Sequence, residues 1–255
     1  LLGTLPDAIP VDGAVQLSLA LAGEPGDYGG SLVLKTDGSP QFYNFPLLGT
    51  IRPLTAEPVC ACASIATPTI PPTAQSQAGS PDNDRLLGTP ASDFMAGYAG
   101  QDEILGRRGQ DFLFGWRGDD RIFAGRGDDW VQGGAGDDFL SGDRGNDTVL
   151  GNDGNDQLIG DNHWAIEAAG QDLLCGGAGQ DTIYGNRGGD TLAGGDDDDV
   201  LFGGQEDDWL WGDGGDDWLW GDRGDNTLVG GTGVDRFGLG PVSYTHLRAH
   251  ETVLD

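Results

Sequence analysis

Apolar residues recur along residues 79–238 with a period of nine. This stretch divides into seventeen nine-residue units plus one insertion of seven residues. The eighth position of every unit is apolar, whereas positions one to six are rich in Gly and Asp. Such self-similarity indicates a repeat architecture.

Positions seven to nine of each unit favour a short β-strand. They carry Leu, Ile, Val, Trp and Thr, which suit strands, and they are too few to form a helix. Alternation along a strand places position eight inward and positions seven and nine outward. Gly at positions one, two and four permits the positive φ angles of tight turns. A short strand followed by a six-residue turn, repeated along the chain, predicts an all-β solenoid.

Acidic residues concentrate in the repeat. The 255-residue chain holds 42 Asp plus Glu against 13 Lys plus Arg, and residues 79–238 carry −24 of the net charge of −29. This charge excludes nucleic-acid binding through a basic surface and argues against docking on anionic lipid. No apolar run reaches the roughly 20 residues of a membrane-spanning helix.

The sixth position carries the candidate metal ligands, because it is Asp in sixteen units and Asn226 in the other. One inward apolar residue per nine makes a thin core. Such a core cannot offset the ordering entropy of a glycine-rich chain, which is roughly 1–2 kcal/mol per residue. A cation between stacked turns would supply the missing stabilisation, and carboxylate and carbonyl oxygens suit Ca²⁺ better than Zn²⁺ or Mg²⁺.

The segments Gly-Gly-Ala-Gly-Asp-Asp-Phe-Leu (133–140) and Gly-Asp-Gly-Gly-Asp-Asp-Trp-Leu (212–219) resemble the RTX, or haemolysin-type, calcium-binding nonapeptide. The resemblance covers residues 79–240 and implies a right-handed parallel β-roll. In that family, several Ca²⁺ ions lie between units n and n+2, held by the sixth-position Asp and by carbonyl oxygens of the glycine-rich turns. The metal ligands that the resemblance implies here are Asp84, Asp93, Asp102, Asp111, Asp120, Asp129, Asp138, Asp147, Asp156, Asp172, Asp181, Asp190, Asp199, Asp208, Asp217 and Asp235.

Several units depart from the repeat pattern. Asp82 and Ala91 replace the fourth-position Gly in the first two units, and Asp197 and Glu206 replace it later. We therefore expect the best sites in the middle turns, from Asp102 to Asp217. The alternative is that these carboxylates form a merely solvated acidic face.

Catalytic signals are absent from the sequence. His163 lies in the insertion, but no Ser, Cys or second His is arranged around it, and neither Gly-x-Ser-x-Gly nor His-Glu-x-x-His occurs. We predict that this stretch of chain is not an enzyme. Cys60 and Cys62 give only a weak metal or redox signal, and Cys175 is interpreted as incidental.

Aromatic residues crowd the last third of the repeat. Trp209 and Trp211 are predicted to point outward on one face, and Trp218 and Trp220 on the opposite face. Exposed Trp pairs can contact a glycan or a protein. The alternatives are that outward strand positions simply favour aromatics, or that a further C-terminal segment covers them.

The two ends differ from the repeat. Residues 1–52 contain a predicted hairpin, with strands at 31–35 and 42–51, and resemble the closing strands of an immunoglobulin-like module of the ASH or choice-of-anchor type. That resemblance implies a partial antiparallel β-sandwich. Residues 53–78 hold five prolines and predict a semi-rigid linker. Residues 241–255 resemble a reading frame of a sequencing adapter, so we expect a non-native tail.

These observations predict a piece of a secreted bacterial protein whose roll folds on binding Ca²⁺ outside the cell. Extracellular calcium-binding modules belong to a weak affinity class, in the millimolar range. The RTX resemblance further implies export of the unfolded chain by a type I secretion system. Two alternatives concern a longer parent protein, in which the roll would be the C-terminal module of a protease or lipase, or part of an adhesin or surface-layer protein.

Overall fold

The computed structural model describes residues 68–161 and 170–238, together with Cys62, Ile65 and the backbone of residues 27–35, 42–50 and 246–248. The described residues form strands and turns. None of them lies in a helix long and apolar enough to cross a membrane.

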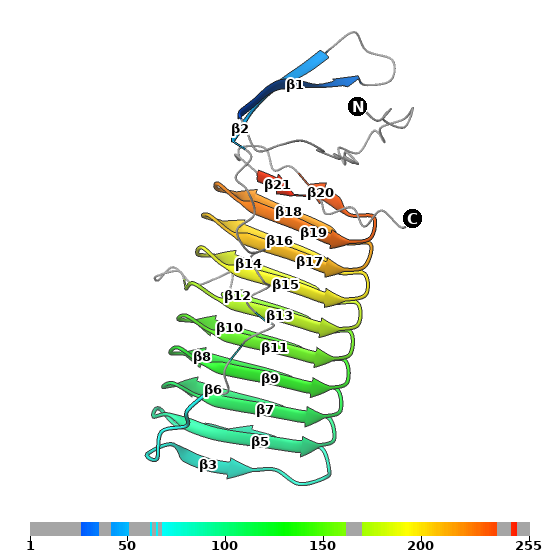
Figure 1. The fold of residues 1–255 in the computed structure, drawn as a ribbon. Helices are drawn as coiled ribbons and strands as arrows, with labels where there is room; N and C mark the ends of the chain where they lie inside the picture. The colour runs from blue at the N-terminus through cyan, green and yellow to red at the C-terminus, as the bar shows by residue number, and fades with distance from the viewer. Residues whose placement is uncertain are drawn as a thin grey trace.

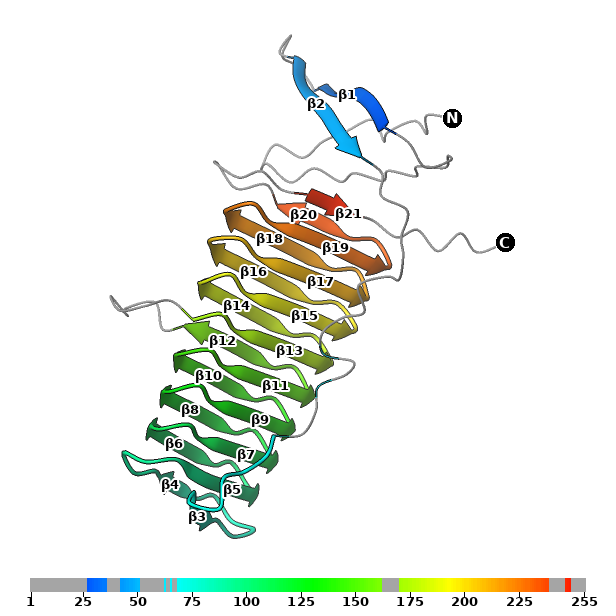
Figure 2. The same ribbon diagram turned by 60° about the vertical axis from the view of Figure 1, so that its left-hand side comes forward.

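Two parallel sheets wind into one long solenoid (Figures 1 and 2). The even sheet consists of β4 (Arg85–Leu87), β6 (Glu103–Arg108), β8 (Arg121–Arg126), β10 (Phe139–Arg144), β12 (Gln157–Asp161), β14 (Thr182–Arg187), β16 (Val200–Gln205), β18 (Trp218–Arg223) and β20 (Arg236–Gly238). The odd sheet consists of β3 (Gln75–Ala78), β5 (Asp93–Ala99), β7 (Phe112–Arg117), β9 (Trp130–Ala135), β11 (Thr148–Asp153), β13 (Leu173–Ala178), β15 (Thr191–Asp196), β17 (Trp209–Gly214), β19 (Thr227–Thr232) and β21 (His246–Arg248).

Consecutive strands alternate between the two sheets, so each strand pairs with the strand two further along the chain. Leu140 of β10 lies between Ile122 of β8 and Leu158 of β12, each of which is two repeat units away in sequence. The insertion lengthens one coil, yet Val149 still pairs with Leu174 and the register is kept. The predicted all-β parallel solenoid and its pairing of units n and n+2 are confirmed.

The core is a double column of eighth-position side chains. These residues, from Leu86 to Phe237, are between 0 and 4 % exposed, and they form one continuous apolar cluster. Each coil consists of two repeat units and therefore contributes only two large apolar side chains. The core is as thin as the sequence predicted, and other interactions must stabilise the turns.

The strands are longer than the sequence predicted. Most contain six residues, because the strand runs on through positions one to three of the next unit, where positions two and three resume the pairing after an unpaired position one. Positive φ angles occur at positions two and four, as in Gly134 and Gly136, but not at the position-one glycines. Our explanation of the position-one Gly by its φ angle was therefore wrong.

The amino-terminal hairpin is confirmed at the level of the backbone. β1 (Asp27–Lys35) and β2 (Phe42–Thr50) pair antiparallel in a continuous register. The rest of the predicted sandwich lies outside the described residues, as does His163. At the other end, β21 pairs in register with β19. The boundary at residue 241 stays a prediction.

Candidate calcium-binding turns

Each turn ends at its sixth-position residue, directly before the next strand. The sixth-position carboxylates from Asp93 to Asp217 are at most 3 % exposed. Burying a charged group is costly unless it is paired or binds a metal. The surroundings of the two carboxylate oxygens therefore decide what these turns can do.

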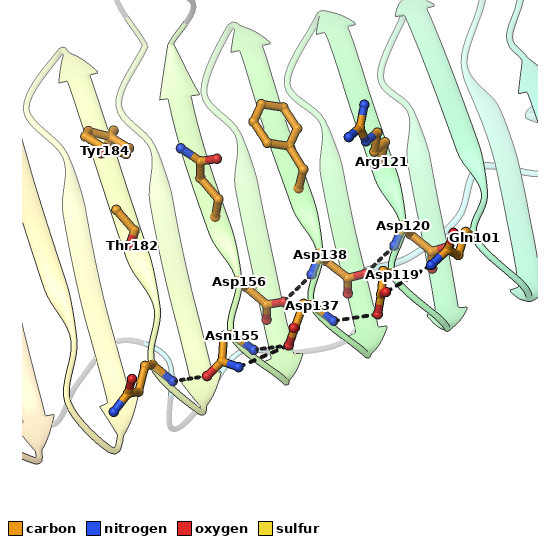
Figure 3. Close-up of a pocket in the computed structure, with 13 residues that line it drawn as sticks. Gln101, Asp119, Asp120, Arg121, Asp137, Asp138, Asn155, Asp156, Thr182 and Tyr184 are labelled. Atoms are coloured by element: carbon orange, nitrogen blue, oxygen red, sulfur yellow. Dashed lines mark hydrogen bonds between the residues drawn. The ribbon is translucent and has the colours of Figure 1, made fainter.

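One oxygen of each buried carboxylate links two coils. Asp138 Oδ1 accepts a hydrogen bond from the backbone N–H of Asp120 at 2.7 Å, and Asp156 Oδ1 accepts one from the N–H of Asp138 at 2.7 Å (Figure 3). The same bond recurs along both edges of the solenoid, at 2.7–2.9 Å through the middle turns. Because the bond joins unit n to unit n+2, it stacks the turns as well as the strands.

The second oxygen, Oδ2, has no hydrogen-bond partner in thirteen consecutive turns, although it is buried. An unsatisfied buried acceptor costs roughly 1–3 kcal/mol, and more when it is charged. Native proteins rarely leave such groups unsatisfied unless they bind an ion or water. The thirteen residues are Asp102, Asp111, Asp120, Asp129, Asp138, Asp147, Asp156, Asp172, Asp181, Asp190, Asp199, Asp208 and Asp217.

The position-one glycine leaves a space beside this oxygen. A Cβ atom placed on Gly185 would lie 2.5 Å from Asp190 Oδ2 and 2.6 Å from the carbonyl oxygen of Gly203 in the next coil. A Cβ on Gly106 would lie 2.7 Å from Asp111 Oδ2 and 2.5 Å from the carbonyl oxygen of Ala124. The missing side chain thus lets a carboxylate oxygen and a carbonyl oxygen from neighbouring coils face one small space.

The donor set of this space suits a hard cation. In the described part of the chain, no three His, Cys, Asp or Glu side chains gather as a metal site. A metal ion would therefore depend on backbone carbonyl oxygens in addition to one carboxylate per turn. Ca²⁺ accepts such oxygen ligands in flexible geometry, whereas Zn²⁺ favours Cys and His, and Mg²⁺ requires a near-ideal octahedron. These residues fit Ca²⁺.

Burial controls the protonation of these carboxylates. Removal from water, together with the neighbouring carboxylates Asp156 and Asp120, raises the pKa of Asp138 to about 8. The pKa of Asp147 is raised to about 9 by burial and by the nearby Asp172. Carboxylates with such pKa values would bind protons at neutral pH unless a cation stabilised their charged form.

A family model describes this arrangement. The RTX calcium-binding nonapeptide repeat matches repeatedly over residues 78–162 and 168–237. The chain belongs to this RTX calcium-binding repeat family. No curated protein matches the chain. The roll is therefore a structural calcium-binding module.

The first two RTX turns satisfy the second carboxylate oxygen with protein groups. The backbone N–H and hydroxyl of Ser80 donate to Asp84 Oδ2 at 2.5 and 2.9 Å. Thr89 donates in the same way to Asp93 Oδ2, at 2.6 and 3.1 Å. A proline follows each of these residues and disfavours a helical backbone at the preceding position, and neither Ser80 nor Thr89 has a positive φ. The Ser-Pro and Thr-Pro pairs were the sequence signal for this difference, which we missed.

Asn226 satisfies its RTX turn in another way. Its Oδ1 accepts from the backbone N–H of Asp208 at 2.8 Å, so the link between coils is kept. Its Nδ2 donates to the carbonyl oxygen of Gly221 at 2.7 Å. An N–H group here occupies the place of the unpartnered Oδ2 and bonds the position-one carbonyl of its own unit.

A polar groove of about 760 Å³ runs along one edge of the roll beside the Asp row (Figure 3). The fifth-position residues on this edge form a second ladder, in which Asp119 Oδ1 accepts from the N–H of Asp137 and Asp137 Oδ1 accepts from the N–H of Asn155. The ladder runs opposite to the Asp row, because the earlier unit supplies the acceptor. It adds stacking bonds that the repeat pattern did not predict.

The structure overturns our interpretation of Cys175 as incidental. Cys175 forms a disulfide with Cys62, with Cα atoms 6.0 Å apart and a sequence separation of 113. Sequence spacing could not reveal this pair, because the contact depends on where the segment before the RTX roll lies.

The Trp pairs lie on opposite sheets as predicted. Trp209 and Trp211 stack on β17 at 5.5 Å between ring centroids, and Trp218 and Trp220 stack on β18 at 5.1 Å. Trp209 is 43 % exposed, but Trp211 is only 7 % exposed. The expectation that all four rings are open to solvent was therefore wrong for Trp211, one face of which Trp209 covers.

Proposed function

We propose that residues 79–240 form a roll that folds as Ca²⁺ fills its turns. One observation carries the proposal, namely the unpartnered, buried Oδ2 of each middle turn, which in most of these turns shares a small space with a carbonyl oxygen of the next coil. The proposed ligands are the thirteen carboxylates from Asp102 to Asp217 named above. Asp84, Asp93 and Asp235, at the ends of the row, are proposed as weaker ligands.

Asn226 supports this assignment from within the molecule. Where the chain lacks the carboxylate, an amide N–H donates to the position-one carbonyl oxygen of its own unit, and this turn needs no ion. Where the carboxylate is present, Oδ2 stands in place of that N–H, so it and the position-one carbonyl oxygen are two acceptors without a donor between them. A cation between the two acceptors would satisfy both.

Linkage between binding and folding provides the mechanism. The acidic repeats repel one another when no ion is bound, and the thin core cannot hold the coils together. Because the turns exist only in the folded chain, the free energy of ion binding becomes free energy of folding. Ca²⁺ at extracellular, millimolar concentration matches the weak affinity class of such modules.

Circular dichroism of the chain tests this function. We expect little β signal in chelator, a cooperative rise with millimolar Ca²⁺, and no comparable rise with Mg²⁺. The variant Asn226→Asp should bind one more Ca²⁺ ion than the wild-type chain by calorimetry, because it restores the second oxygen. A β signal that persists unchanged in chelator contradicts the proposal.

We further propose that the module works outside the cell. The Cys62–Cys175 disulfide supports this location, since disulfides form and persist mainly in oxidising compartments. An acidic chain that stays unfolded at low Ca²⁺ suits passage through a type I secretion system. Trypsin sensitivity in chelator, lost with Ca²⁺, would show the two states, whereas resistance in both would argue against export as an unfolded chain.

The stacked aromatic rings favour a contact surface at the C-terminal end of the roll. Tyr184, Phe202 and Trp220 stack in one column on the even sheet, at 5.0 Å between neighbouring centroids. We propose a glycan or protein contact through Trp209, Trp218 and Trp220, with the buried Trp211 supporting the ring of Trp209. Replacing Trp209, Trp218 and Trp220 with Thr should abolish that contact and preserve Ca²⁺-induced folding. A longer parent could be a protease or lipase, or an adhesin or surface-layer protein, and the roll itself would supply no catalytic group.

A further inference from the structure

The Cys62–Cys175 disulfide joins the segment before the roll to the middle of the roll. Cys62 precedes the solenoid, whereas Cys175 lies in β13, the sixth strand of the odd sheet counted from β3. β3 itself begins at Gln75, a short way along the chain from Cys62. The chain is thus fixed first at the middle of the odd sheet and then at its first strand.

The chain between Cys62 and Gln75 is long enough to span the distance from β13 to β3. β3 and β13 are five strand spacings apart, or about 24 Å at roughly 4.8 Å per strand. The chain from Cys62 to Gln75 reaches about 40 Å in the extended polyproline conformation, and it contains Pro68, Pro71 and Pro72. Figures 1 and 2 show residues 68–74, in cyan, passing along the outside of the lower coils. We name residues 68–74 the strap.

Cys175 occupies a sensitive position in the repeat. It lies in register between Leu150 of β11 and Ala193 of β15, and it is only 7 % exposed. β13 is the first strand after the insertion, where the sequence separation between bonded turns changes from 18 to 25. The cross-link therefore joins the segment before the roll to the first strand after the insertion.

We propose that the Cys62–Cys175 bond is a calcium-gated latch, which forms only on the folded roll and then holds the roll against loss of Ca²⁺. The latch rests on the proposed calcium-dependent folding. In the unfolded chain 113 residues separate the two thiols, so they rarely meet. In the folded chain, β13 and the segment before the strap bring their Cα atoms within 6.0 Å.

The chemistry requires an external oxidant of the disulfide class. A thiolate from one Cys attacks a disulfide such as oxidised glutathione and forms a mixed disulfide, with release of one glutathione thiol. The second Cys then attacks the mixed disulfide, which releases the second glutathione thiol and leaves the Cys62–Cys175 bond. The two Cys residues together lose two protons and two electrons, and one oxidised glutathione is reduced to two thiols.

The latch should have a large effect on the folding equilibrium at fixed Ca²⁺ and a small effect on the Ca²⁺ concentration at which half of the chain is folded. Closing a loop of this length stabilises the folded state by restricting the unfolded chain. At fixed Ca²⁺, the ratio of folded to unfolded chain should rise on the order of a thousandfold. The Ca²⁺ midpoint should fall by only about 2- to 3-fold, because many ions share the change.

The experiment uses the full chain, reduced and placed in glutathione buffer with either millimolar Ca²⁺ or chelator. Alkylation of free thiols and mass spectrometry follow the disulfide over time. Cys175→Ser removes the latch, and Cys60→Ser is the matched control, because it removes a neighbouring thiol and leaves both latch residues. We expect the Cys62–Cys175 bond to form in Ca²⁺ and not in chelator, in the wild-type chain and in Cys60→Ser alike.

Circular dichroism after chelation completes the test. The oxidised wild-type chain should lose its β signal more slowly than Cys175→Ser, and reductant should remove the difference. Equal oxidation with and without Ca²⁺, in a chain that folds only with Ca²⁺, would overturn the gate. If the oxidised wild-type chain and Cys175→Ser lose their β signal at the same rate, the latch is overturned. A β signal that never depended on Ca²⁺ would instead contradict the proposed function.

Discussion

The first two turns and the thirteen turns that follow all place an Asp at the sixth position, but they differ in what surrounds its second carboxylate oxygen. Ser80 and Thr89 supply donors to the second carboxylate oxygen in the first two turns. From Asp102 to Asp217 no protein donor reaches that oxygen. The roll therefore begins with turns whose carboxylates the protein satisfies by itself and continues with turns whose second carboxylate oxygen has no protein partner. We propose that the N-terminal turns cap the stack and that an ion satisfies the turns that follow.

The largest effect should come from removing one carboxylate in the middle of the stack. Asp147→Ala removes a proposed Ca²⁺ ligand and the acceptor for the N–H of Asp129. We expect the free energy of unfolding in saturating Ca²⁺ to fall by about 3 kcal/mol or more, since a hydrogen bond to a charged group alone contributes roughly 1.5–3 kcal/mol.

Asp84→Ala is the matched variant at the capped end. It should cost less, about 2 kcal/mol, because it removes hydrogen bonds to protein donors but no proposed ion in the middle of the stack, and its turn has a neighbour on one side only. Urea unfolding of both variants measures the difference. Equal losses would show that the capped and uncapped turns are energetically alike.

When Ca²⁺ is absent, acid should stabilise the folded chain by protonating the buried carboxylates that have no protein donor at Oδ2. The pKa of Asp138 is raised to about 8 in the folded chain, from an ordinary value of 3.8. Between about pH 4 and pH 8 the folded, metal-free chain therefore binds more protons than the unfolded chain, and its stability falls as pH rises. In chelator, the β signal should increase as the pH is lowered from 8 to 5.5.

When Ca²⁺ is present, lowering the pH should hinder folding instead of favouring it. Protons compete with Ca²⁺ for these carboxylates, so the Ca²⁺ concentration needed for folding should rise as the pH is lowered. A Ca²⁺ midpoint that does not depend on pH across this range would contradict the assignment of these carboxylates as ligands.

The capping hydroxyls should have a smaller, local effect. Ser80→Ala removes the 2.9 Å hydrogen bond to Asp84 Oδ2 and leaves the backbone N–H in place. We expect a loss of about 1 kcal/mol in saturating Ca²⁺, measured by urea unfolding. Bound Ca²⁺, counted by calorimetry, should not decrease. A loss of bound ions would mean that Ser80 belongs to a calcium site and not to a cap.

A change of similar size but in the opposite direction, a gain in stability, is expected in a strained turn of the stack. Glu206 takes the fourth position with a φ of 81°, a conformation that Gly adopts freely. Glu206→Gly should raise the free energy of unfolding by about 1 kcal/mol. Asp197→Gly, at a φ of 76°, is the control and should gain less, because Asp tolerates this conformation better. Thermal unfolding in Ca²⁺ compares the two.

The repeating features of the fold could be predicted from the sequence because they are local and occur many times. Leu140 and Leu158 are buried for the same reason as every other eighth-position residue, so a single pattern predicts the whole core. The Asp row follows from the same register. Its position next to a carbonyl oxygen of the following coil required the structure.

Features that occur once could not be found in this way. Cys62 and Cys175 meet because the chain runs back along the odd sheet, a path that the repeat does not encode. The roles of Ser80 and Thr89 depend on the prolines that follow them, which change the backbone of two turns only. The position-one Gly was explained wrongly, since its role is a close approach between coils and not a positive φ.

Because the strands alternate between two sheets, repeat units can be inserted or deleted without disturbing later strands only in pairs. Because a strand returns to the same sheet only after two repeat units, duplication or deletion of two units preserves every later position. Deletion of a single unit upstream would exchange the two sheets for all later strands. Trp209 and Trp218 would then trade faces, and Cys175 would move to the sheet opposite Cys62. Lineages of this protein should therefore gain and lose repeats in pairs.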